Sequence, residues 1–263
     1  MTLTALPQSG PGYIPEINRA LRRKSGIQAT LLDGDLGIDF LNEFNWTADA
    51  YFKGNPYLKV LRLENGVVTG SNVPSVILAA SILRERGLHL PLLPDIENSF
   101  RAGSLDLQTY FVDLSLLLRT EDDPSYQENN PISWNLARQL AYRKISFSPE
   151  KTAVLPLSSL ELHNSDKNKY GLSFRIRDNL DLREYPYTSY TLSMETSFET
   201  EDTSLETGIP RRTRIHDGSR KIWTRNEGLS VLSFHGGDLH GDSGGLAYSN
   251  PLGRILVMRK VFS

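Results

Sequence analysis

The stretch after about residue 150 constrains the fold most, because short β-type runs follow one another there at close spacing. The runs include TAVLPL, YGLSFRIRD, GLSVLSF and GRILVMRKVF, and glycine, asparagine, aspartate and proline separate them. Apolar runs of this length with turn residues between them are typical of antiparallel sheets. We therefore expect a mainly antiparallel sheet in the C-terminal half of the chain.

The part before residue 150 contains the clearest helix signals. The segment 71–87 offers an N-cap at Ser71 or Asn72, a proline in its first turn and a terminal Gly87. A second helix is predicted over 132–145. We expect an α+β fold in which these two principal helices, from the N-terminal half, pack on the sheet.

The remaining segments favour one α+β domain over residues 1–263, with only a weak change of composition near 150. Residues 1–15 are expected to form a loose N-terminal arm, followed by a short helix over 15–26. A hairpin with an Asn-Gly turn is predicted over 57–70, and a strand with alternating apolar residues over 107–120.

Composition excludes several classes of function. The 263 residues include no cysteine, which rules out disulfides, thiolate metal sites and a cysteine nucleophile. The formal net charge of -2 provides no global attraction to nucleic acid or anionic lipid. Since the N-terminus lacks the pattern of a signal peptide and no apolar run is long enough to span a bilayer, we expect a cytoplasmic protein without membrane partners.

The string GDSGG at 241–245 resembles the nucleophile loop of trypsin-like serine proteases, with Ser243 as the nucleophile. That site requires a histidine base, an orienting aspartate and an oxyanion hole. No upstream histidine stands in the sequence context that the resemblance implies. Only 20 residues (263 minus 243) follow Ser243, too few for the strands of that fold. The resemblance is therefore limited to five residues.

The overlapping string GDLHG at 237–241 resembles the first metal-binding motif of calcineurin-like metallophosphoesterases, with Asp238 and His240 as ligands. The family also needs histidine ligands further along the chain. This sequence has no histidine after His240, so the two-metal site cannot be completed in that order.

A looser hypothesis keeps the segment 235–243 as a candidate site. His235, Asp238, His240 and Asp242 supply four potential ligands for a divalent metal within eight residues. In a curled loop they could converge, and in an extended strand Asp238, His240 and Asp242 would share one face. The alternative is a solvated glycine-rich turn. The catalytic candidates are Asp238, His240 and Ser243.

Basic residues gather in the segment 211–225, which we interpret as a hairpin with an Asp-Gly turn at 217–218. Cations beside an aromatic ring suit a phosphate backbone with stackable bases. The acidic segment just upstream could equally pair with these charges across a solvated sheet. The candidate nucleic-acid-binding residues are Arg212, Arg214, Arg220, Lys221, Trp223 and Arg225.

Three functions therefore remain open from the sequence. The first is a non-catalytic binding or assembly protein, with a protein partner or a second copy of itself. The second is a hydrolase, metal-dependent if any cofactor is used, acting through residues 235–243. The third is nucleic-acid binding through the basic segment.

Overall fold

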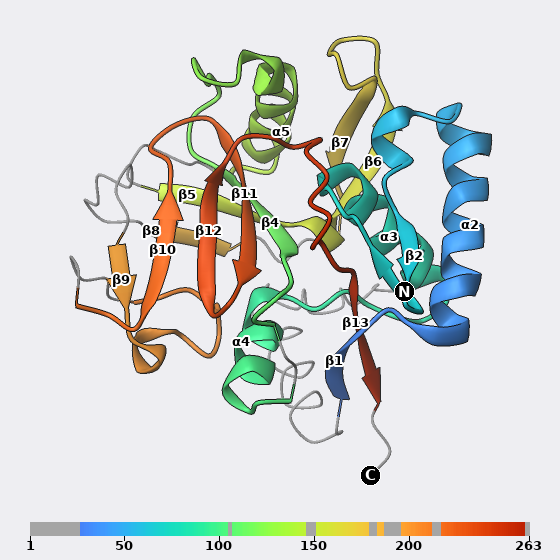
Figure 1. The fold of residues 1–263 in the computed structure, drawn as a ribbon. Helices are drawn as coiled ribbons and strands as arrows, with labels where there is room; N and C mark the ends of the chain where they lie inside the picture. The colour runs from blue at the N-terminus through green and yellow to red at the C-terminus, as the bar shows by residue number, and fades with distance from the viewer. Residues whose placement is uncertain are drawn as a thin grey trace, which may run out of the picture.

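The computed structural model describes residues 27–104, 107–145, 151–178, 183–186, 196–211 and 217–260. The arm expected at 1–15 and the helix expected at 15–26 lie outside these ranges. The described helices are α2 (Gly34–Phe52), α3 (Val73–Glu85), α4 (Leu93–Arg101) and α5 (Asn130–Tyr142) (Figure 1). None of the helices in the described ranges has the length and apolar character needed to cross a bilayer.

The expected α+β fold is confirmed by a seven-stranded, mostly antiparallel sheet. Only one neighbouring pair, β10 with β12, runs parallel. Six of the seven strands follow residue 150, and β4 joins them from the earlier part of the chain. In order across the sheet, the strands are β8 (Arg183–Pro186), β5 (Lys151–Pro156), β4 (Val112–Leu118), β11 (Leu229–His235), β12 (Asp238–Ser243), β10 (Arg220–Thr224) and β9 (Thr196–Phe198).

Three two-stranded sheets accompany the main sheet. They pair β1 (Ile27–Leu31) with β13 (Leu256–Lys260), β2 (Arg62–Glu64) with β3 (Val67–Thr69), and β6 (Leu160–Asn164) with β7 (Leu172–Ile176). The β2–β3 pair confirms the predicted hairpin. Asn65 and Gly66 both have positive φ angles, 51° and 79°, as a two-residue turn of this type requires.

The two predicted helices are α3 and α5. At the start of α3, the Asn72 side chain accepts a hydrogen bond from the Ser75 N–H at 2.9 Å, and the Ser75 hydroxyl accepts one from the Asn72 N–H at 2.9 Å. This reciprocal cap satisfies two amides that a helix start leaves unpaired. Gly87 ends the segment with a φ of 71°, as its sequence position predicts.

The longest described helix, α2, was not predicted from the sequence. Gly37, Phe40, Phe44 and Ala48 form its buried stripe, at the spacing of a helix face. The helix also contains glycine, asparagine and threonine, which have weak helix propensity. Packing of the two phenylalanines, with ring centroids 5.7 Å apart, stabilises a helix that local propensity alone does not indicate.

Helix α4 was not predicted from the sequence either. Its start signals are Pro94 in the first turn and Asp95, whose carboxylate accepts a hydrogen bond from the Leu92 N–H at 2.9 Å. Negative charge at this end of a helix also interacts favourably with its dipole.

Hydrophobic residues fill both faces of the sheet. One cluster joins α2, α3, α5 and the β6–β7 pair to β4, β5 and β11. The other lies under α4 and includes Leu232, Phe234 and Leu239. Figure 1 shows α2 and α3 on the right of the molecule, whereas β12, β10 and β9 lie on the left. The first cluster includes no residue from β12, β10 or β9. The sheet face that this cluster covers on β4, β5 and β11 is therefore not covered by it on those three strands.

A buried ion pair connects α4 to β10. Arg220 donates two hydrogen bonds to the Glu97 carboxylate, at 2.9 and 2.6 Å, and the side chains are only 5% and 0% exposed. The Arg220 Nε–H also donates to the carbonyl of Gly237 in the β11–β12 turn. Three phenylalanine rings surround the guanidinium at 4.6 to 5.6 Å. One side chain thus connects α4, β10 and the turn.

We expect Glu97→Gln to lower the free energy of unfolding by about 3–5 kcal/mol, because it leaves the Arg220 charge buried without a counter-charge. Urea unfolding measures the loss. The matched control is Glu43→Gln, which breaks the more exposed pair between Glu43 and Arg86 and should cost at most about 1 kcal/mol. Equal losses in the two variants would contradict the role assigned to the Arg220 pair.

Candidate functional site

The segment 235–243 forms the turn and the second arm of a tight hairpin rather than a long loop. Only Gly236 and Gly237 make the turn, with φ angles of 61° and 95°, and His235 pairs directly with Asp238. Glycine is required at 237 because a Cβ atom there would lie 2.9 Å from the Phe100 ring. The extended alternative is therefore the correct one for Asp238 and His240, which lie two residues apart on β12.

The strand register brings polar residues from four strands onto one sheet face. Ser233 on β11 lies opposite Asp113 on β4 and opposite His240 on β12. His240 in turn lies opposite Trp223 on β10. Directly paired residues project from the same face of a sheet. These four side chains therefore form a row across β4, β11, β12 and β10.

Aromatic and imidazole rings dominate this part of the sheet. Trp223 stacks on His240 with centroids 4.4 Å apart and planes 20° apart, and Phe111 stacks on His235 at 3.9 Å and 5°. The two pairs meet where His240 lies 5.5 Å from Phe111 and 6.0 Å from His235. All four residues are partly exposed. We call Phe111, Trp223, His235 and His240 the ring face.

A cation lies at each end of the ring face. The Arg254 guanidinium is 4.5 Å from the centroid of the Tyr110 ring, next to Phe111. The Lys221 ammonium is 5.8 Å from the Trp223 ring centroid. Both distances are within the range of attraction between a cation and an aromatic ring.

His235 has a defined hydrogen-bonding state in its neutral form. Its Nδ1 is 3.1 Å from the Tyr110 carbonyl oxygen. Because a carbonyl only accepts, Nδ1 must carry the proton, which leaves Nε2 with a lone pair. The ring can therefore accept a hydrogen bond, bind a metal ion or take up a proton at Nε2.

Burial lowers the pKa of His240 below its ordinary value. The carboxylates of Asp242 and Asp238 oppose this shift, and His235 adds slightly to it. Desolvation has the largest effect, since the stacked Trp223 and the nearby Phe111 keep water from the imidazole. His240 is consequently neutral at pH 7.

Asp113 lies beside this row, where burial raises the pKa of its carboxyl group. The hydrogen bond from the Ser233 hydroxyl, at 2.6 Å, partly offsets the rise. This carboxyl faces the same region as the two histidines. Perturbed ionisable groups that cluster together are typical of functional sites.

The other candidates at 242 and 243 lie outside the row. The β11–β12 register shifts after Ser233, and Asp242 and Ser243 are both exposed. The Ser243 hydroxyl accepts a weak hydrogen bond from the Gly245 N–H at 3.4 Å. The Asp238 carboxylate accepts one from the Lys221 N–H at 2.7 Å. Among the described residues, no three acidic or histidine side chains are grouped as a metal site would require.

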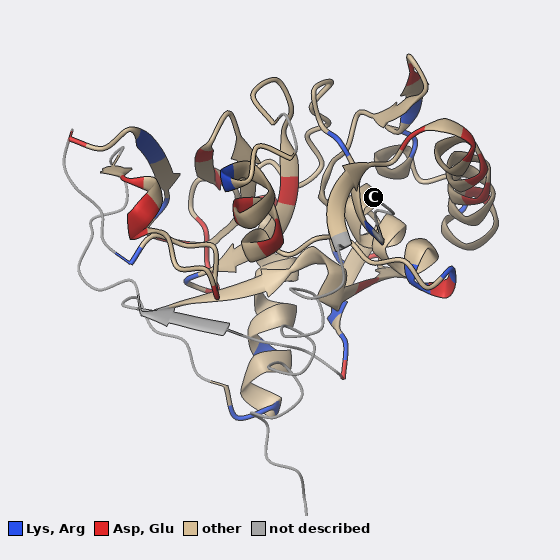
Figure 2. Ribbon diagram, turned by 90° about the horizontal axis from the view of Figure 1, so that it is seen from below, with Lys and Arg blue, Asp and Glu red and all other residues tan. Residues whose placement is uncertain are grey.

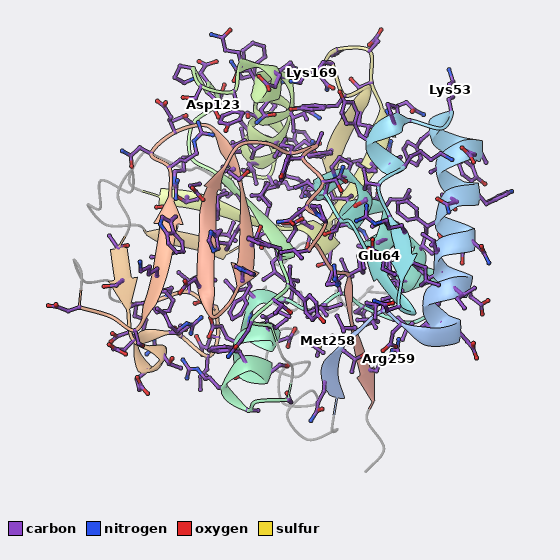
Figure 3. The ribbon with its side chains drawn as sticks, viewed as in Figure 1. Lys53, Glu64, Asp123, Lys169, Met258 and Arg259 are labelled. Carbon is purple, nitrogen blue, oxygen red and sulfur yellow. The ribbon has the colours of Figure 1, made fainter. Side chains whose placement is uncertain are left out.

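The basic candidates have separate environments. Arg220 is buried against Glu97, and Arg225 pairs with Asp123 at 2.6 Å and lies over the Tyr126 ring at 4.7 Å. Figure 3 labels Asp123 in the segment leading to α5. Lys221 and Trp223 belong to the face already described. Arg212 and Arg214 lie outside the described residues.

The pairing expected for the basic hairpin is wrong for β10. This strand pairs with β9 along one edge and with β12 along the other. The Asp-Gly signal at 217–218 instead precedes the β9–β10 contact, where the Gly218 N–H donates to the Ser197 hydroxyl at 2.8 Å.

Sequence reasoning missed five residues of this region, which are Tyr110, Phe111, Asp113, Ser233 and Arg254. They lie far from residues 235–243 along the chain or carry no motif. The available signal was the run from Tyr110 to Asp113 at the start of a predicted strand, where an acid follows two aromatic residues. Register across four strands brings them together, and a single sequence does not specify it.

Comparisons of the chain with protein-family models, curated proteins and solved structures found no match.

We expect the His240 imidazole to titrate below pH 6.5, its ordinary value. NMR titration of the imidazole resonances measures this pKa. Trp223→Ala admits water to the ring and should raise the pKa towards the ordinary value, whereas Trp46→Ala, on the far helix α2, should leave it unchanged. A pKa at or above 6.5 in the unmodified protein would contradict the packing described.

The same shift predicts a loss of stability at low pH. Since the unfolded chain binds the His240 proton more readily, this contribution to stability is complete above pH 6.5. It is lost as the pH falls through the unfolded pKa towards the lower folded one. His240→Gln should reduce this part of the pH dependence of unfolding.

Proposed function

We propose that the protein is a binding protein whose ligand lies on the ring face. The observation that supports this most is the pair of ring stacks, Trp223 on His240 and Phe111 on His235, left partly exposed across four strands. Rings held by neighbouring strands lose little freedom when they contact a ligand. Partly exposed aromatic rings with a few polar groups among them are the usual lining of small-ligand sites.

The state of the two hydroxyl groups favours binding over hydrolysis. The Ser233 hydroxyl donates a hydrogen bond to the Asp113 carboxylate, and the Ser243 hydroxyl accepts one from the Gly245 N–H. A serine nucleophile is commonly activated by a histidine that a third group orients. Ser243 has no base among its described contacts, and Ser233 is hydrogen-bonded to Asp113 directly, with no histidine between them. The neutral His240 supports hydrolysis as a second candidate, because it can accept a proton near pH 7. A cytoplasmic location, inferred from the lack of cysteine, belongs to the same proposal.

NMR titration with neutral planar compounds such as indole and adenosine tests the binding function. The protein has three tryptophans, so its three indole N–H resonances report on separate places in one spectrum. We expect the Trp223 resonance to shift, while those of the exposed Trp46 and Trp134 stay in place. His240→Ala should weaken binding by about 1–3 kcal/mol, the usual range for one stacking contact.

The control variant is Trp46→Leu, which removes an aromatic ring that is 62% exposed on α2 and should leave binding unchanged. Proton uptake and turnover of ester or phosphoester substrates test the hydrolase alternative. If every planar compound left the Trp223 resonance unmoved, the binding function would be rejected.

A further inference from the structure

The charges around the ring face decide which ligands suit it. Its two ends carry Lys221 and Arg254, each within reach of an aromatic ring. A cationic ligand would have to compete with Lys221 for the Trp223 ring. An anionic ligand would instead gain from both cations.

The dimensions suit a ligand with more than one flat or charged group. The ring face extends from the start of β4 across β11 and β12 to β10. Three strand spacings of roughly 4.8 Å give about 14 Å between its ends. A base lying on Trp223 and His240 occupies the end of this face nearest Lys221, and the remaining length leaves room for a second phosphate group towards Arg254.

Hydrogen-bonding groups lie among the rings as well. The His235 Nε2 accepts, as its contact with the Tyr110 carbonyl dictates. The exposed amino groups of nucleobases are donors that suit such an acceptor. We infer that the ring face binds a nucleotide unit, with the base against Trp223 and His240 and a phosphate at Lys221. This inference rests on the proposed binding function.

Three acidic residues oppose such a ligand, namely Asp113 in the row with His240 and two residues of β12, and they sharpen the test. Asp238 lies beside Lys221, with its carboxylate on the Lys221 backbone amide, and Asp242 is exposed further along β12. Acidic and basic residues are also interspersed over the whole ribbon, as Figure 2 shows. Attraction of a phosphate is therefore local and depends on the two cations at the ends of the rings.

The experiment compares adenosine, AMP and a short single-stranded oligo(dA) by titration of the Trp223 indole resonance. We expect AMP to bind more tightly than adenosine. Lys221→Gln should weaken AMP binding by a factor of about five to ten and leave adenosine binding unchanged. Lys53→Gln is the matched control, since Figure 3 places Lys53 at the end of α2, far from β10. Asp238→Asn should tighten AMP binding.

The arms separate a free nucleotide from a nucleic-acid strand. If oligo(dA) binds more tightly than AMP, the ligand is a nucleic-acid strand that also contacts Arg254. The logarithm of its affinity should then fall with the logarithm of salt concentration at a slope of about -1.4, as expected for two neutralised phosphates. Equal affinity identifies a free nucleotide. Both results support the inference.

Other outcomes overturn it. If adenosine and AMP bind equally tightly, or if the Lys221→Gln variant binds AMP unchanged, the phosphate contact at Lys221 is rejected. The proposed binding of planar ligands then still stands. If indole binds but no nucleoside or nucleotide does, the nucleotide inference fails and the proposed binding function stands. If none of these compounds binds, the inference and the proposed function fail together.

Discussion

The buried pair of Arg220 and Glu97 holds together the part of the molecule on which the candidate site depends. Its guanidinium fixes α4, β10 and the carbonyl of Gly237 at once. Because that turn begins β12, its position sets where His240 meets Trp223 on the opposite face. Charge buried on one side of the sheet thus fixes the arrangement of rings on the other.

The sheet uses its two faces differently along its width. Over β4, β5 and β11, helices and the β6–β7 pair cover one face with apolar side chains. On the same face of β11 and β12, the pattern changes to Ser233, His235 and His240. Leaving partly exposed rings there contributes less to stability than full burial would. Beside these rings lie His240 and Asp113, whose pKa values are both shifted by burial, and clustered groups of this kind are typical of functional sites.

Sequence reasoning identified what depends on local chemistry. It identified α3 by its cap and terminal glycine, the Asn65–Gly66 hairpin, and the antiparallel character of the second half. It failed for α2, which packing stabilises against weak propensity. For the site, it singled out His235, Asp238 and His240 by their density along the chain. It could not pair them with Phe111, Asp113 or Trp223, because register across four strands depends on the whole sheet.

The central claim is that the four rings form a preorganised face in the free protein. The most direct measurement is the set of NMR chemical shifts of the carbon-bound imidazole protons of His235 and His240. Stacking on Phe111 and Trp223 predicts upfield ring-current shifts. They should be lost for His235 in Phe111→Leu and for His240 in Trp223→Leu. Shifts in the free protein that match those of an unstructured histidine would contradict the account.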